Sequence, residues 1–127
     1  MPLVNCYAGQ LNQVFMNIFS NAIDALEESL TTKDITPQIR ISTKQTDQNS
    51  VRISIADNGS GISPDAQEKL FDPFFTTKPV GKGTGLGLSI SYQVVVDKHH
   101  GTIECKSEPD QGTEFIIQLP IRAQDRA

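Results

Sequence analysis

Polar residues at helical spacing are the first feature of this sequence that could support chemistry. Asn17, Asn21, Asp24 and Glu28 are separated by four, three and four residues, so in a helix they form one line along its surface. Asparagine is a poor helix former, and its amide oxygen is a neutral, hard ligand that suits Mg2+ when phosphates and water complete the coordination. A solvated helix flank explains the same spacing, and at this point both interpretations stay open.

A second feature is the glycine-rich turn that follows Asp57, in the sequence "DNGSGI". Asn-Gly is typical of a tight hairpin, but here a helix start follows, with Ser63 as N-cap and Pro64 at the first helical position. Glycines at 59 and 61 let a ligand approach the backbone closely. A carboxylate at the end of a buried strand needs a hydrogen-bond donor. An exocyclic amine such as that of adenine would supply one, although a simple turn remains an alternative.

The third feature is the loop that ends in "GKGTGLGLS", residues 81–89. Its G-x-G-x-G-x-G spacing matches neither the P-loop nor the dinucleotide fingerprint, and no strand leads directly into it. Its last glycines open a helix near Leu86, where exposed N–H groups at the positive end of the dipole would bind an anion. Lys78 and Lys82 would add positive charge for phosphate. A disordered surface loop with incidental glycines is the alternative.

Helices and strands must position these residues. Hydrophobic periodicity predicts the following elements. They are a helix over 10–30, strands over 38–44 and 51–57, a short helix to about Leu70, a loop over 72–85, a helix from about Leu86 to His100 with Gly101 as its stop, and strands over 102–107 and 113–121. Phe71, Phe74 and Phe75 would anchor the near end of the loop in the core. The expected fold class is α+β: a two-layer sandwich whose mixed, mostly antiparallel sheet has helices on one face.

Composition limits the remaining possibilities. The 127 residues suit one domain, and a net charge of −4 argues against non-specific binding to nucleic acid. Cys6 and Cys105 are far apart, so neither a metal motif nor a disulfide framework is indicated. No apolar run reaches 18 residues and no signal pattern opens the chain. We therefore expect a cytoplasmic domain without direct membrane contact.

Together these stretches resemble the ATP-binding catalytic domain of bacterial sensor histidine kinases. Its superfamily, often called GHKL, also contains type II topoisomerases, mismatch-repair ATPases and a heat-shock chaperone. The resemblance covers about Gln10 to Pro120 and follows the family's order of motifs: an N box in "NQVFMNIFSNAIDAL", then "DNGSGI", "FDPFFTTK" and "GKGTGLGLS". It implies a Bergerat-type ATP-binding fold, a single ATP-binding domain over 1–127 with an ATP lid at about 72–88, and no dimerisation or phosphoacceptor domain in this chain.

The resemblance also implies roles for individual residues. Asn21 would ligate Mg2+ with Asn17 beside it, Asp57 would accept the adenine amino group, and Thr113 would support the pocket. The implied nucleotide-binding set is Asn21, Asp24, Asp57, Gly59, Gly61, Ile62, Phe75, Lys82, Gly83, Thr84, Gly85, Leu86, Gly87, Leu88 and Thr113. The implied catalytic residues are Asn17, Asn21 and Lys78, and whether Lys78 or Lys82 reaches the γ-phosphate stays open.

One position separates two chemistries. Superfamily members that hydrolyse ATP carry a glutamate where this chain has Asn17, and an amide cannot take a proton from water. This favours phosphoryl transfer to a protein side chain over hydrolysis. The two histidines, His99 and His100, lie at the predicted end of a helix, where we expect a capping or structural role.

The predicted function is therefore binding of Mg-ATP and transfer of its γ-phosphoryl group to a histidine on a separate dimerisation domain, and from there to a response regulator. The resemblance allows a membrane-anchored parent kinase. The alternatives are a stand-alone ATPase of the same superfamily, a relative that phosphorylates serine on a small regulatory protein, and a non-catalytic module that senses nucleotide or docks a partner.

Overall fold

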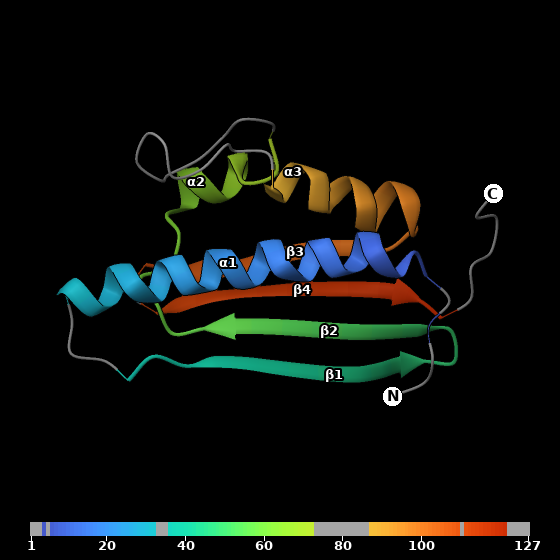
Figure 1. Ribbon diagram of the computed structural model, residues 1–127, viewed down its shortest axis with the longest axis horizontal. Coiled ribbons are helices and arrows are strands. Elements are labelled where there is room, and N and C mark those ends of the chain that lie inside the picture. The colour runs from blue at the N-terminus through green and yellow to red at the C-terminus, as the bar shows by residue number, and fades with distance from the viewer. Residues whose placement is uncertain (1–3, 5, 33–35, 73–86, 110, 122–127) are drawn as a thin grey trace.

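A computed structural model of the protein describes residues 4, 6–32, 36–72, 87–109 and 111–121 (Figure 1). For residues 28–32 it describes the backbone alone. The helices are α1 (Ala8–Thr32), α2 (Pro64–Lys69) and α3 (Gly87–Tyr92), and α3 continues into a π-helical segment over Gln93–Lys98. The strands are β1 (Ile39–Asp47), β2 (Ser50–Asp57), β3 (Thr102–Glu108) and β4 (Gly112–Pro120).

The four strands form one sheet in the order β1-β2-β4-β3, and all three pairings are antiparallel. The helices lie together on one face of this sheet (Figure 1). The predicted two-layer α+β fold is thus confirmed. The sheet is antiparallel and not mixed, because no parallel pair occurs among the described strands. Alternating strands joined by tight turns, as in "TDQNS" between β1 and β2, favour this antiparallel arrangement.

The core forms between α1 and the inner face of the sheet. One stripe of α1, at spacings of three and four residues, is buried: Leu11, Val14, Ile18, Ala22 and Leu26. It packs on rows of paired strand residues, such as Ile53 beside Ile117. Burying each large aliphatic side chain stabilises the fold by about 1.5–3 kcal/mol. This packing fixes the rotation of α1, and so the direction in which its polar flank faces.

The predicted start of α2 is confirmed. The Ser63 side chain accepts a hydrogen bond from the Ala66 N–H at 3.2 Å, and proline opens the helix. Phe71, just beyond α2, packs against the core as expected and contacts the Tyr92 ring at 5.5 Å between centroids. Phe74 and Phe75 lie outside the described residues.

His99 connects the residue before α1 to the end of the π-helical segment that follows α3. It is fully buried, its Nδ1 lies 2.8 Å from the Val94 carbonyl oxygen, and its Nε2 accepts the Tyr7 N–H at 2.9 Å. Because a carbonyl only accepts, Nδ1 carries the proton and the ring is neutral. The rings of Tyr7 and His99 also meet edge to face at 5.3 Å. The structural role predicted for His99 is therefore observed.

The helix was predicted to run to about His100 with Gly101 as its stop, and it ends at Lys98 instead. The left-handed residue is His100, with φ of 56°, and Gly101 does not have positive φ. The N–H groups of His100 and Gly101 donate to the carbonyls of Val96 and Val95. Glycine is required at position 101 because the backbone there lies against β4. A Cβ on this residue would lie 2.2 Å from the Gln118 carbonyl oxygen. This contact comes from tertiary structure, which local sequence does not reveal.

The two positions should therefore respond oppositely to substitution. We expect His100→Gly to raise the free energy of unfolding by about 0.5–1 kcal/mol, since relief of left-handed strain exceeds the entropy cost of glycine. Gly101→Ala should lower it by more than about 1 kcal/mol, because the new methyl group meets backbone. Urea unfolding of both variants measures this. A Gly101→Ala variant as stable as the wild type would contradict the assignment.

Candidate nucleotide site

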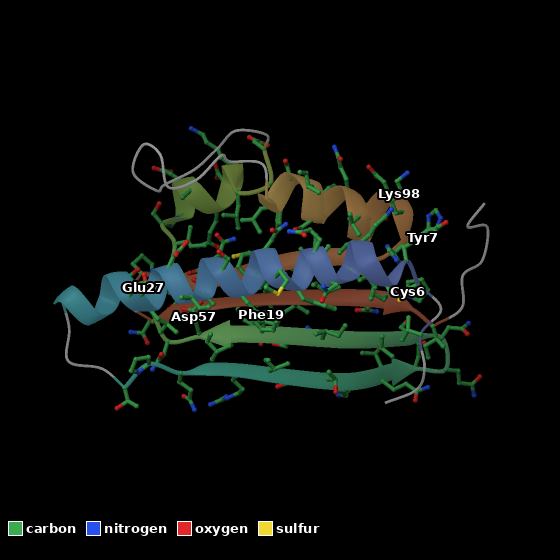
Figure 2. The ribbon with its side chains drawn as sticks, viewed as in Figure 1. Cys6, Tyr7, Phe19, Glu27, Asp57 and Lys98 are labelled. Atoms are coloured by element: carbon green, nitrogen blue, oxygen red, sulfur yellow. The ribbon has the colours of Figure 1, made fainter. Side chains whose placement is uncertain are left out.

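The predicted adenine-binding residue stands in a polar row across three strands. Asp57 on β2 pairs with Thr113 on β4, which pairs in turn with Ser107 on β3. Directly paired residues present their side chains on the same face of a sheet. The preceding row on this face is Ile55, Phe115 and Cys105, which belongs to the core. The polar row is therefore the end of the helix-covered face, at the opposite end of the molecule from Cys6 and Tyr7 (Figure 2).

The Asp57 carboxylate is held by backbone donors. The Gly59 N–H donates to Oδ1 at 2.8 Å, and the Thr113 N–H also donates to the carboxylate. Burial raises the pKa of Asp57 above its ordinary value of 3.8, and these two donors oppose the rise only in part. The stability due to this group is thus greatest below pH 3.8 and falls as pH rises through the folded pKa. At neutral pH the partly buried carboxylate opposes folding, and a ligand that donates to it would relieve that cost.

The carboxylate also affects its neighbour in the core. Burial, and secondarily the charge of Asp57, raise the pKa of the Cys105 thiol to about 12. At neutral pH this cysteine is a protonated, unreactive thiol. It closes the apolar side of the site and supplies no nucleophile.

The turn after Asp57 is held by two residues that the sequence analysis did not select. The Ser107 hydroxyl accepts the Ile62 N–H at 2.7 Å, contacts the Thr113 hydroxyl at 2.9 Å and donates to the Gly112 carbonyl at 2.9 Å. The Gln67 amide on α2 donates to the carbonyls of Ile62 and Ser107, each at 2.9 Å. These bonds fasten the "DNGSGI" turn to the β3–β4 hairpin. The only local signal was a serine that ends an alternating strand before "EPDQG".

The two N-box asparagines differ in their contacts. The Asn17 amide nitrogen donates to the Gly87 carbonyl at 3.1 Å and to the Ser91 hydroxyl at 3.2 Å, and its oxygen accepts from Gln13 at 3.0 Å. The half-buried Asn21 amide makes no hydrogen bond within the described residues. Its oxygen is therefore suited to a cation, whereas Asn17 is already engaged with α3. Asp24, one turn on, is exposed on the same helix.

The sequence profile of histidine kinase-, DNA gyrase B- and HSP90-like ATPases matches residues 7–123. The chain belongs to this ATPase family. Among its relatives, sporulation kinase E of Bacillus subtilis is 40% identical over 122 residues, which are 96% of this chain and 15% of that protein. The chain thus spans a small part of this relative's length.

Solved structures agree with this assignment. The catalytic domain of the histidine kinase ThkA matches with a TM-score of 0.75 and 34% identity, over 93% of this chain and 71% of that one. Full-length ShkA in complex with AMPPNP matches with a TM-score of 0.73 and 29% identity, over 91% of this chain and 22% of that one. The fold is that of sensor histidine kinase catalytic domains, and the chain is a kinase-type ATPase domain.

Much of the predicted lid falls outside the part of the chain that the structure describes: Phe75, Lys78, Lys82, Gly83, Thr84, Gly85 and Leu86. Their roles stay predictions. Of the remaining set, Ile62 and Leu88 pack against the core, and Gly87 opens α3 beside Asn17. Within the described residues, no group of three His, Cys, Asp or Glu side chains forms a metal site, and no helix is long and apolar enough to cross a bilayer.

The glycines of the turn have structural reasons that the ATPase motif alone did not reveal. Gly61 has φ of +78°, and a Cβ there would lie 2.1 Å from the Glu108 carbonyl oxygen. A Cβ on Gly59 would lie 3.0 Å from Asp57 Oδ1 and 3.1 Å from Ala25 on α1. Both glycines thus permit contacts within the protein, and their predicted role of giving the base room stays a prediction.

Paired substitutions separate the two asparagines. Asn17→Asp replaces an amide donor by a carboxylate that faces the Gly87 carbonyl, so we expect the free energy of unfolding to fall by about 1–3 kcal/mol. Asn21→Asp makes the same change one turn along, where the amide has no partner among the described residues, and should cost less than about 0.5 kcal/mol. Urea unfolding without nucleotide measures both. Equal losses would contradict the anchoring of α3 by Asn17.

Proposed function

We propose that this domain binds Mg-ATP and donates the γ-phosphoryl group to a histidine on a separate dimerisation domain of a two-component sensor kinase, which then serves a response regulator. The polar row of Asp57, Thr113 and Ser107 carries this proposal. It holds a partly buried carboxylate that accepts from two backbone donors and can accept from a third. An amino group such as that of adenine suits this acceptor. The complex of the related ShkA with AMPPNP supports an adenine nucleotide.

The phosphates would extend from this row toward α1 and the start of α3. Asn21, whose amide has no other partner among the described residues, would supply an oxygen to Mg2+, with Asn17 beside it. When bound, Mg2+ would neutralise phosphate charge and hold the phosphates in line for transfer. The backbone of Gly83, Gly85, Leu86 and Gly87 would hold the phosphates, with positive charge from Lys78 or Lys82.

The chain's own residues favour transfer over hydrolysis. The first N-box position is Asn17, and its nitrogen is committed to the Gly87 carbonyl and the Ser91 hydroxyl. It can neither take a proton nor polarise water as a carboxylate would. Catalysis would then rest on positioning and charge neutralisation. His99 is fully buried, and the exposed His100 adopts the left-handed backbone conformation that ends the helix. We therefore place the acceptor histidine on another domain.

The adenine assignment is tested by Asp57→Asn. The amide presents N–H where the carboxylate accepts, so we expect ATP affinity to fall by about a hundredfold, the value of a hydrogen bond to a charged group. Isothermal titration calorimetry measures the affinity. Asp97→Asn, the same change at an exposed position on the π-helical segment, is the matched control and should bind ATP normally. Unchanged affinity in Asp57→Asn would overturn the assignment.

The reaction is tested by mixing the chain with a histidine-bearing dimerisation domain and γ-labelled ATP. We expect acid-labile label on the histidine domain and slow release of phosphate when the chain is alone, because Asn17 provides no base. Rapid Mg-dependent release of phosphate by the isolated chain would favour a stand-alone ATPase. Bound ATP with label on neither protein would favour a non-catalytic nucleotide-sensing module.

A further inference from the structure

Ser91 on α3 is a polar side chain in the interior of the fold, where polar groups need hydrogen-bond partners. It is 0% exposed, and its hydroxyl donates to the Gly87 carbonyl at 2.8 Å. The same oxygen accepts from the Asn17 amide nitrogen at 3.2 Å. The Asn17 nitrogen reaches the Gly87 carbonyl as well, at 3.1 Å. Three groups from two helices therefore close one small hydrogen-bonded triangle.

The carbonyl determines the direction of every bond in this triangle. A carbonyl oxygen only accepts, so both Ser91 and Asn17 must donate to it. Ser91 donates its single hydroxyl proton to the Gly87 carbonyl, so its oxygen can only accept from Asn17. The Asn17 amide must then place its nitrogen toward α3. An amide that turned over would bring its oxygen against the Gly87 carbonyl oxygen and leave the buried Ser91 oxygen without a donor, which is unfavourable.

With the nitrogen fixed, the Asn17 oxygen faces away from α3. Its partner there is the exposed Gln13 amide, at 3.0 Å along the flank of α1. A bond between two flexible amides at the surface is weak and is readily replaced by a stronger ligand. The amide oxygen of asparagine is a hard ligand of the kind that Mg2+ prefers.

We propose that Ser91 is a positioning residue which, with the Gly87 carbonyl, locks the Asn17 amide so that its oxygen is presented to the Mg2+ of bound nucleotide. This inference rests on the proposed function. It explains how Asn17 both anchors α3 and serves the cation, through opposite ends of one amide. It also explains why aspartate would not serve at this position, since a carboxylate has no donor for α3.

The test is the Mg2+ dependence of ATP affinity, taken as the ratio of the dissociation constants without and with Mg2+. Calorimetry on the 127-residue chain gives both constants. We expect Ser91→Ala to lower this ratio about fivefold, the value of one hydrogen bond, while affinity for ATP without Mg2+ is kept. Ser54→Ala is the matched control, because it removes a partly buried serine hydroxyl that donates to Glu114 and lies on β2.

A double-mutant cycle shows whether Ser91 acts through Asn17. If it does, Asn17→Ala and the double variant Asn17→Ala/Ser91→Ala have the same ratio. A ratio in Ser91→Ala equal to that of the wild type would overturn the inference, and so would an equal loss of affinity with and without Mg2+, which marks a purely structural role. Absence of ATP binding by the wild type would instead overturn the proposed function. If Ser91→Ala does not fold, the comparison of Asn17→Ala with Asn17→Asp decides: the inference requires that neither retains the Mg2+ dependence of the wild type.

Discussion

The site depends on the register between β2, β4 and β3. This register places Asp57, Thr113 and Ser107 in one row and three apolar rows behind it. Since side chains alternate between faces, a slip of one residue would move the carboxylate to the far face and expose Ile53 and Ile55. The hydrophobic core that stabilises the sheet therefore also specifies where the polar row stands. The nucleotide binding that we propose at this end of the sheet would therefore depend on packing along its length.

The first helix links the core to the proposed cation-binding residues in the same way. Its buried stripe and its asparagines are interleaved along one helix, with Ile18 next to Asn17 and Ala22 next to Asn21. Because the stripe is locked against the sheet, the asparagines have little freedom to rotate around the helix axis. The turn after β2 is fitted to this helix through the close approach of Gly59 to Ala25. The two ends of the proposed nucleotide site are thus held at one distance by one helix.

Local sequence patterns were sufficient to predict the helices, strands and motifs. They did not reveal the residues that hold these motifs in place through hydrogen bonds. Periodicity located α1, the four strands and the Ser63 cap, since each depends on near neighbours. Ser107, Gln67 and Ser91 were not selected, because each has a hydrogen-bond partner far away in the sequence. These partners are Ile62 for Ser107, Ser107 for Gln67 and Asn17 for Ser91. The same limit explains the error at His100 and Gly101. Gly101 reads as a helix stop, yet its requirement comes from Gln118 on a strand that follows.

Backbone groups set the polarity at both ends of the site. Two N–H groups fix the Asp57 carboxylate as an acceptor, and one carbonyl fixes the Asn17 amide with its nitrogen inward. Backbone donors and acceptors cannot change identity by substitution, so the side chains must match them. A carboxylate suits the first environment and an amide suits the second, and exchanging the two would leave groups of like polarity in contact. The difference between Asp57 and Asn17 thus matches contacts that the fold makes within itself, and the amide that attaches α1 to α3 is the residue that we propose supplies no general base.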